Sequence, residues 1–298
     1  LREKIPVAEY AKLANDFTAE RFDAERIAEF AVDCGMRYIN ITTRHHDSFC
    51  LFKTSQTDFN SLNAPCGRDL VGELAAACEG RHLGLCLYYS HGRDWRHPHA
   101  PNNDEWGGSA RPKYDPPDPA YAYGEEHDLQ KYVDFMKAQI TELLTQYGPV
   151  ASIWLDGIAT PMSGDAAAFQ CQELYDHIHS LQPQVLVSYK QGLTGTEDYF
   201  APEHHVPRED EDVKRHGQIG ARPEKTVEVC TTMSPGSWGY KKDETGTHLD
   251  EEQVWDKLSE AGRRGYNLLL NTGPLPDGSL DSEDEAVMRA IGARLRKE

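Results

Sequence analysis

Residues 36–47 read MRYINITTRHHD, a stretch of strand length that leads directly into charged and polar residues. Residues 83–95 (LGLCLYYSHGRDW) and 151–157 (ASIWLDG) follow the same order, with the apolar part first and the polar or aromatic part last. In a (β/α)8 barrel, the active-site groups lie on the loops that leave the carboxyl ends of the strands. This order therefore predicts a parallel barrel with its chemistry on one rim.

Strand-length apolar segments alternate with helical periodicity along the chain, which favours βα units and a parallel sheet. We expect strands at residues 36–43, 83–90, 151–157, 185–190, 226–233 and 266–273. We expect helices at residues 24–34, 68–81, 127–147, 165–181, 250–264 and 282–296. Together they predict a TIM-like α/β barrel in which residues 1–298 form a single domain. A seventh strand is expected around residues 198–200, and another before Leu1.

The balance of charges excludes some classes of partner. The 298 residues include 49 acidic and 31 basic side chains, for a formal net charge of −18. Such a charge repels phosphate backbones and anionic lipids, so we expect neither nucleic acid nor a membrane as partner. Seven cysteines without CxxC spacing favour buried free thiols and a reducing compartment. No signal peptide or membrane-length apolar run is recognised, and the expected location is cytoplasmic or periplasmic.

Asp156 is the first candidate for catalysis because it ends an apolar strand segment and precedes a glycine. A carboxylate in that position can attack the anomeric carbon of a sugar. Trp154 lies on the same side of the strand, where an aromatic wall suits a sugar face. Both residues also have a structural interpretation, namely an ordinary Asp-Gly turn for Asp156 and a core position for Trp154.

Two further groups follow neighbouring strands. His45 and His46 could bond sugar hydroxyls or a metal ion, or they could be one packed and one solvated histidine. Alternation along a strand would turn one imidazole inward and the other sideways, which argues against a metal pair. Tyr88 and Tyr89 offer phenol donors for hydroxyl recognition, although a structural role is the commoner one for such a pair.

A second carboxyl group is expected in the acidic stretch at residues 197–205 or at Glu228. Retaining glycosidases use two carboxyl groups roughly 5 to 5.5 Å apart, of which one is the nucleophile and the other acts first as acid and then as base. Asp198, Glu203 and Glu228 are all eligible by residue type.

Taken together, these segments resemble glycoside hydrolase family 29, the α-L-fucosidases. The resemblance covers nearly the whole chain, in the family's order. It rests on REKIPVAEYAKLANDF (2–17), GMRYINITTRHHDSFCLFKT (35–54), LCLYYSHGRDW (85–95), IWLDG (153–157), TEDYFAPE (196–203), SWGY (237–240) and NLLLNTGPLPDGSL (267–280). It implies a TIM-like barrel, a double displacement with net retention that uses neither metal nor cofactor, and a fucosylated oligosaccharide or glycoside as substrate.

The resemblance also implies roles for individual residues. Asp156 matches the family's nucleophile, and Trp154 matches the aromatic residue beside it. His45 and His46 match the pair that bonds the fucose hydroxyls. Tyr89, taken from the YYS motif, matches a hydroxyl donor at the sugar.

The remaining matches lie further along the chain. Lys190 stands where many members carry an arginine, which keeps the charge but not the forked geometry. Trp238 of SWGY is expected among the sugar-binding residues. Glu203 matches the acid/base through its similarity to a pattern found in some bacterial members. Asp198 and Glu228 are its rivals.

Two features depart from the family pattern. The chain begins at LREKIPVAEY, after the first-strand motif that members usually carry, and no β-sandwich follows the barrel. An open barrel edge needs a covering partner, for which a homo-oligomer is a candidate. Two alternatives therefore stay open. One is a metal-dependent hydrolase or sugar isomerase, which chelators would inhibit. The other is a sugar-binding or catalytically degenerate barrel, which would bind fucose without turnover.

Overall fold

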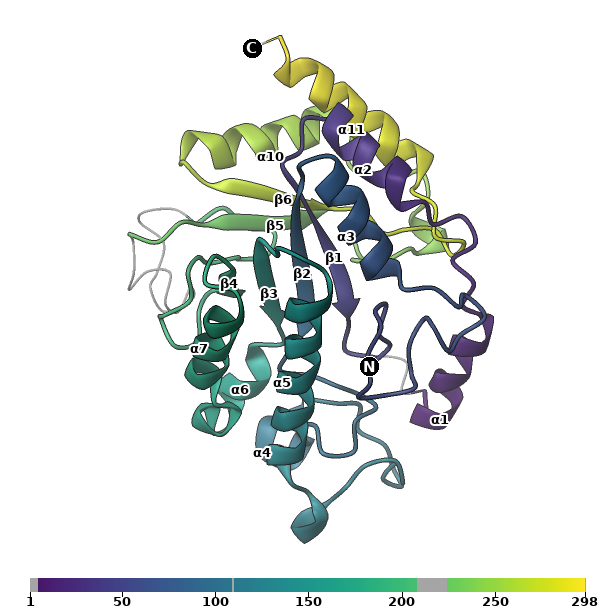
Figure 1. Cartoon of the computed structure of the whole chain (residues 1–298), viewed down its shortest axis with the longest axis vertical. Coiled ribbons are helices and arrows are strands. Elements are labelled where there is room, and N and C mark those ends of the chain that lie inside the picture. Colours follow the sequence, from purple (N-terminus) through teal and green to yellow (C-terminus); the bar gives the residue numbers. More distant parts are fainter. Residues whose placement is uncertain (1–4, 109, 208–223, 298) are drawn as a thin grey trace. The chain divides into compact units, whose positions relative to one another are not determined.

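The computed structural model describes residues 5–108, 110–207 and 224–297, which divide into two compact units (Figure 1). The first unit comprises the described residues up to Thr18, together with Asn40–Ala76 and Leu85–Tyr189. The second comprises Ala19–Ile39, Ala77–Gly84 and the described residues from Lys190 onward. Within these ranges, no helix is both long enough and apolar enough to cross a membrane.

The first unit is built on a four-stranded sheet with the strand order β1-β2-β3-β4. The strands are β1 (Tyr38–Arg44), β2 (Gly84–Ser90), β3 (Ser152–Asp156) and β4 (Leu186–Tyr189). β3 pairs in parallel with both β2 and β4, and Ser90 is the register partner of Asp156. The carboxyl ends of β2 and β3 therefore meet at the same edge of the sheet.

Helices follow or flank these strands. They are α1 (Val7–Tyr10), α3 (Leu70–Gly80), α4 (Asn103–Trp106), α5 (Leu129–Gln146), α6 (Ala159–Ser163) and α7 (Cys171–Leu181), with 3-10 turns at Ala11–Asp16, Gly124–Glu126 and Ala166–Phe169. The side chain of Asp128 caps α5 by accepting the backbone N–H of Gln130. The buried residues of α5, such as Val133, Met136 and Ile140, recur every three or four positions. This apolar stripe faces the core, and α5 packs against α7 (Figure 1).

The described residues of the second unit include a two-stranded parallel sheet and several helices. They are α2 (Ala24–Asp33), β5 (Glu228–Thr232), α10 (Glu251–Arg263), β6 (Asn267–Asn271) and α11 (Ser282–Leu295), with a 3-10 turn at Lys242–Glu244. Its core consists of Phe30, Cys34, Met233, Val254, Met288 and Ile291. A Cβ at Gly292 would lie 2.7 Å from the Cα of Cys34, so only glycine allows α11 to approach the end of α2 this closely.

The six expected strands are confirmed with shorter bounds, and so are the expected helices with one exception. The helix expected at residues 165–181 divides at Gln170, whose φ of +51° separates the 3-10 turn at Ala166–Phe169 from α7. Around the expected seventh strand, two isolated parallel bridges, Phe200↔Val227 and Glu203↔Cys230, align the segment with β5. All seven cysteines are buried free thiols, as expected. The strand expected before Leu1 lies outside the described residues, and the single-domain organisation stays a prediction.

Candidate active site

Asp156 is the last residue of β3, and its backbone anchors the loop that follows β2. The N–H groups of His91 and Gly92 donate to the Asp156 carbonyl at 3.0 and 2.8 Å. Gly157 has a φ of +87°, and a Cβ at Gly92 would lie 2.2 Å from the Gly157 carbonyl oxygen. Glycine at both positions lets the two loops meet backbone to backbone. These backbone contacts fix the end of β3 and with it the position of the Asp156 carboxylate.

The Asp156 carboxylate is held on both oxygens. The Tyr88 hydroxyl donates to Oδ2 at 2.5 Å, and the Gly157 N–H donates to Oδ1 at 2.5 Å. His46 Nε2 lies 3.7 Å from the same Oδ2 atom, and the Asp156 side chain keeps 13% of its surface exposed. Hydrogen bonds to an ionised acceptor are short and directional, so this carboxylate has a defined orientation while a reactant can still reach it.

Aromatic rings form a wall beside this carboxylate. The Tyr88 ring stacks against His45, with centroids 5.3 Å apart, and against Trp154, with centroids 5.5 Å apart. Trp95 meets the ring of His46 edge-on at 5.4 Å. Trp154 is only 2% exposed and so also belongs to the core, which agrees with the structural interpretation of this residue. His45 and Tyr88 are the half-buried members of this wall.

The tyrosine beside Asp156 is Tyr88, whereas Tyr89, the one expected at the sugar, points away from this carboxylate. Tyr89 is completely buried, its hydroxyl donates to Gln139 Oε1 at 2.8 Å, and the Arg44 guanidinium lies 4.4 Å from its ring centroid. Successive side chains of a strand point to opposite faces, and Tyr88 is the register partner of Trp154. The strand register would have identified Tyr88, but neighbouring strands cannot be aligned from one sequence.

His45 and His46 both have a ring nitrogen within 4.8 Å of a carboxylate oxygen of Asp156. The expectation that strand alternation turns the two rings in different directions is therefore wrong. β1 ends at Arg44, and the alternation ends with it. One ligand atom each from His45, His46 and Asp156 lies within 4.8 Å of the others. Among the described residues, this is the group of histidine, cysteine and acidic side chains with the spacing to hold a metal ion.

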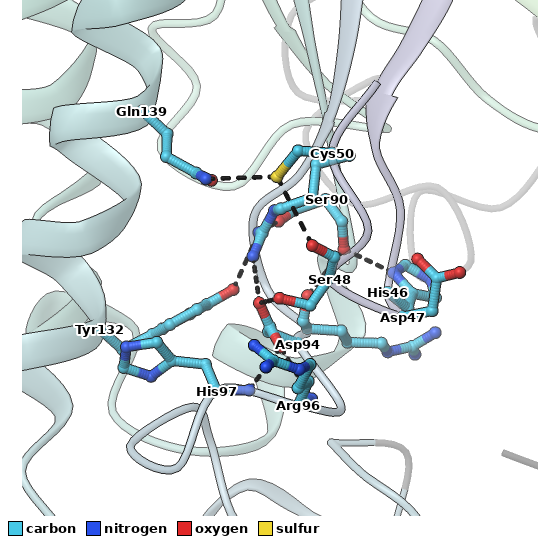
Figure 2. A network of polar contacts seen from close by, with 12 residues as sticks. His46, Asp47, Ser48, Cys50, Ser90, Asp94, Arg96, His97, Tyr132 and Gln139 are labelled. Carbon is cyan, nitrogen blue, oxygen red and sulfur yellow. Dashed lines mark hydrogen bonds and ion pairs between the residues drawn. The ribbon is translucent and has the colours of Figure 1, made fainter. Parts of the chain in front are cut away.

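A buried polar network lies behind the histidines (Figure 2). Arg44 and Asp94 form an ion pair with both side chains fully buried. The Ser48 hydroxyl donates to Asp94 Oδ2 at 2.8 Å, and two backbone N–H groups of the same loop donate to Oδ1 at 2.8 and 2.7 Å. The N–H of Trp95 donates to the His46 carbonyl at 2.7 Å. The network thus ties the loop after β2 to the residue that faces Asp156.

Buried histidines near this network are neutral. Burial, and to a lesser degree the charge of Arg44, lower the pKa of His91 to about 3. Burial also lowers the pKa of His97 to about 4, although the charge of Asp94 opposes the change. Neither imidazole holds a second proton near pH 7, so neither is suited to donate one to a reacting group.

Other expected residues come together in the second unit. Lys190, directly after β4, forms an ion pair with Glu203, and its carbonyl accepts the Ala201 N–H at 2.7 Å. The ring of Trp238 stacks on His204, with centroids 4.7 Å apart. Lys190 is nearly buried, whereas Glu203 is exposed. The expected site residues thus fall into two groups, one in each unit.

The two rivals of Glu203 differ in their surroundings. Asp198 is exposed and lies in the same loop as Glu203. Glu228 is the first residue of β5, is 6% exposed, and accepts hydrogen bonds from Tyr38 and from Asn267 Nδ2, the latter at 3.0 Å. It therefore lies at the amino end of its strand, whereas active-site groups of a parallel barrel lie at carboxyl ends. This position makes Glu228 a weaker candidate for the acid/base than Glu203 or Asp198.

Comparisons with known proteins agree on one family. The model of the family described as Alpha-L-fucosidase matches residues 4–298. The tissue α-L-fucosidase of Mus musculus is 27% identical over 98% of this chain, which spans 59% of the mouse protein. α-L-Fucosidase isoenzyme 1 from Paenibacillus thiaminolyticus has a TM-score of 0.84 at 32% identity, covering 99% of this chain and 68% of that one. An α-L-fucosidase from Lactobacillus casei, solved with its α-L-fucose product, has a TM-score of 0.80 at 27% identity, covering 99% of this chain and 85% of that one.

Proposed function

Because the chain belongs to the α-L-fucosidase family, whose model matches residues 4–298, we propose that it hydrolyses terminal α-L-fucose from glycans or glycosides. The observation that carries the proposal is the Asp156 carboxylate, oriented by Tyr88 and Gly157 at the carboxyl end of β3. A fixed, accessible carboxylate is what attack on an anomeric carbon requires. That residues 1–298 act as one catalytic domain is part of the same proposal.

The proposed reaction is a double displacement. Asp156 attacks the anomeric carbon, the glycosidic C–O bond breaks, and Glu203 gives its proton to the departing oxygen. Glu203 then takes a proton from water, and the water oxygen displaces Asp156 from the sugar. Each step inverts the anomeric centre, so the released fucose keeps the α configuration. Asp198 is the alternative acid/base, because it is exposed in the same loop.

The other residues are proposed to bind the sugar. His45 and His46 lie beside Asp156, where their ring nitrogens suit the hydroxyls of fucose. Lys190 and Trp238 offer a charged donor and an aromatic face in the second unit. Tyr88 takes the place that the sequence suggested for Tyr89, and its contact with Asp156 gives it a role in orienting the nucleophile.

The proposal is tested with para-nitrophenyl α-L-fucoside. We expect nitrophenolate release, and proton NMR at early times should show α-L-fucose before mutarotation. Azide added to the Glu203→Ala and Asp198→Ala variants should restore turnover only where the acid/base has been removed, with α-L-fucosyl azide as product. First appearance of the β anomer would refute the double displacement, and fucose binding without turnover would favour the sugar-binding alternative.

The two neighbouring tyrosines provide a matched pair of variants. Tyr88→Phe removes the hydrogen bond to Asp156, and we expect kcat/KM to fall on the order of 10-fold to 100-fold, equivalent to about 1.4 to 2.7 kcal/mol, with little loss of stability. Tyr89→Phe removes the buried bond to Gln139, and we expect it to lower the free energy of unfolding by ~1 to 3 kcal/mol with little change in kcat/KM. Kinetics and urea unfolding of both variants check this. The reverse assignment of effects would contradict the placement of Tyr88.

A further inference from the structure

We propose that His45, His46 and Asp156 form a binding site for a divalent transition-metal ion such as Zn²⁺, and that the ion and the sugar exclude one another. The ion would bind Asp156 Oδ2, the oxygen to which the Tyr88 hydroxyl donates and near which His46 Nε2 lies. Metal binding itself does not depend on the proposed function. Inhibition of hydrolysis by the metal does rest on it.

The spacing of the ligand atoms fits such an ion. His46 Nε2 and Asp156 Oδ2 are 3.7 Å apart, and the ligand atoms of all three residues lie within 4.8 Å of one another. Zinc binds imidazole nitrogen at about 2.0–2.1 Å and carboxylate oxygen at about 2.0–2.2 Å, so two ligands of a tetrahedral ion are about 3.4 Å apart. His46 and Asp156 are close to that separation already. The exposed side chain of His45 has room for the small remaining adjustment.

The tautomer of His46 also suits metal binding. Ser90 is completely buried, and its hydroxyl donates its only proton to the Arg93 carbonyl at 2.7 Å. The His46 Nδ1 atom, 2.5 Å from the same Ser90 oxygen, must then be the donor of that hydrogen bond (Figure 2). In its neutral form the ring therefore carries its proton on Nδ1, which leaves the Nε2 lone pair on the side of Asp156. A ligating histidine whose other nitrogen donates to a buried group is the usual arrangement in metal sites.

The donor set determines which ions should bind. Two imidazole nitrogens and one carboxylate oxygen suit Zn²⁺, Ni²⁺ and Cu²⁺. Mg²⁺ and Ca²⁺ prefer sites made only of oxygen ligands. Three protein ligands leave a fourth position open, as in zinc sites that exchange a bound water. Since the ion would bind the carboxylate that is proposed to attack the sugar, it would act as a competitive inhibitor.

Isothermal calorimetry with ZnCl₂ tests the site. We expect the wild-type chain and the His82→Asn control, which alters an exposed histidine with a φ of +56°, to bind one ion with the same affinity. His46→Gln and Asp156→Asn should lose this binding, and Ser90→Ala should weaken it about tenfold or more. His45→Gln changes an exposed residue and gives a second ligand variant that should stay folded, which thermal unfolding verifies.

Competition distinguishes this site from adventitious binding. α-L-Fucose should weaken Zn²⁺ binding in proportion to its occupancy, whereas MgCl₂ and CaCl₂ should give no heat at the same concentrations. Zinc binding that persists unchanged in both His46→Gln and Asp156→Asn would overturn the proposal. So would zinc binding that fucose leaves unaltered in a chain that hydrolyses the fucoside. If no fucoside is hydrolysed but Zn²⁺ still binds through these three residues, the proposed function fails and the metal site stands.

Discussion

Asp156→Ala is expected to abolish hydrolysis of para-nitrophenyl α-L-fucoside while the chain remains folded. Removing the attacking carboxylate should lower kcat on the order of 10⁴-fold or more, equivalent to about 5 kcal/mol of lost transition-state stabilisation. The fold should tolerate the change because the backbone contacts of Asp156 with His91 and Gly92 do not involve its side chain. Steady-state kinetics and circular dichroism measure the two effects.

Chemical rescue separates a lost nucleophile from a disturbed site. Azide can enter the space that the carboxylate leaves and attack the sugar directly. A single displacement inverts the anomeric centre, so Asp156→Ala should release β-L-fucosyl azide, whereas a variant lacking the acid/base should release the α anomer. Ordinary activity in Asp156→Ala, or rescue that yields the α anomer, would show that another residue is the nucleophile.

Of the variants proposed for this chain, Arg44→Met is expected to lower the free energy of unfolding the most. The Arg44 and Asp94 side chains are both fully buried, so removing the guanidinium leaves the Asp94 charge without its counter-ion. Breaking a buried ion pair in this way costs about 3–5 kcal/mol, and urea unfolding should show a loss of that size. The loop after β2 should loosen as well, because Asp94 accepts two of its backbone N–H groups.

Two further variants control for this effect. Arg44→Met combined with Asp94→Asn removes both charges and should recover part of the loss. Lys12→Gln breaks the exposed ion pair with Glu9, whose side chains are 64% and 58% exposed, and should change the free energy of unfolding by less than about 1 kcal/mol. An Arg44→Met protein that unfolds within about 1 kcal/mol of the wild type would contradict the importance of the network.

Local patterns were sufficient for the elements and for the first candidate residue. Each β-strand appeared as an apolar run that ends in polar residues, because the body of a parallel strand packs in the core and its carboxyl end leads into the loops that carry active-site groups. Asp156 could be singled out for the same reason, since it stands where such a run stops. The buried free cysteines followed from their apolar surroundings and irregular spacing.

Tertiary structure decided which side chains share a site. The choice between Tyr88 and Tyr89 depends on the register of β2 against β3, and a shift of one residue moves every side chain to the other face. His45 and His46 converge on Asp156 only because β1 ends one residue before them. Glu228 was eligible by residue type, and only the structure shows that it lies at the start of β5, away from the carboxyl ends of the strands. Hydrophobic periodicity and composition are properties of a few neighbouring residues. The register of the strands, the points where they end and the Arg44–Asp94 ion pair depend instead on contacts between segments far apart in the chain.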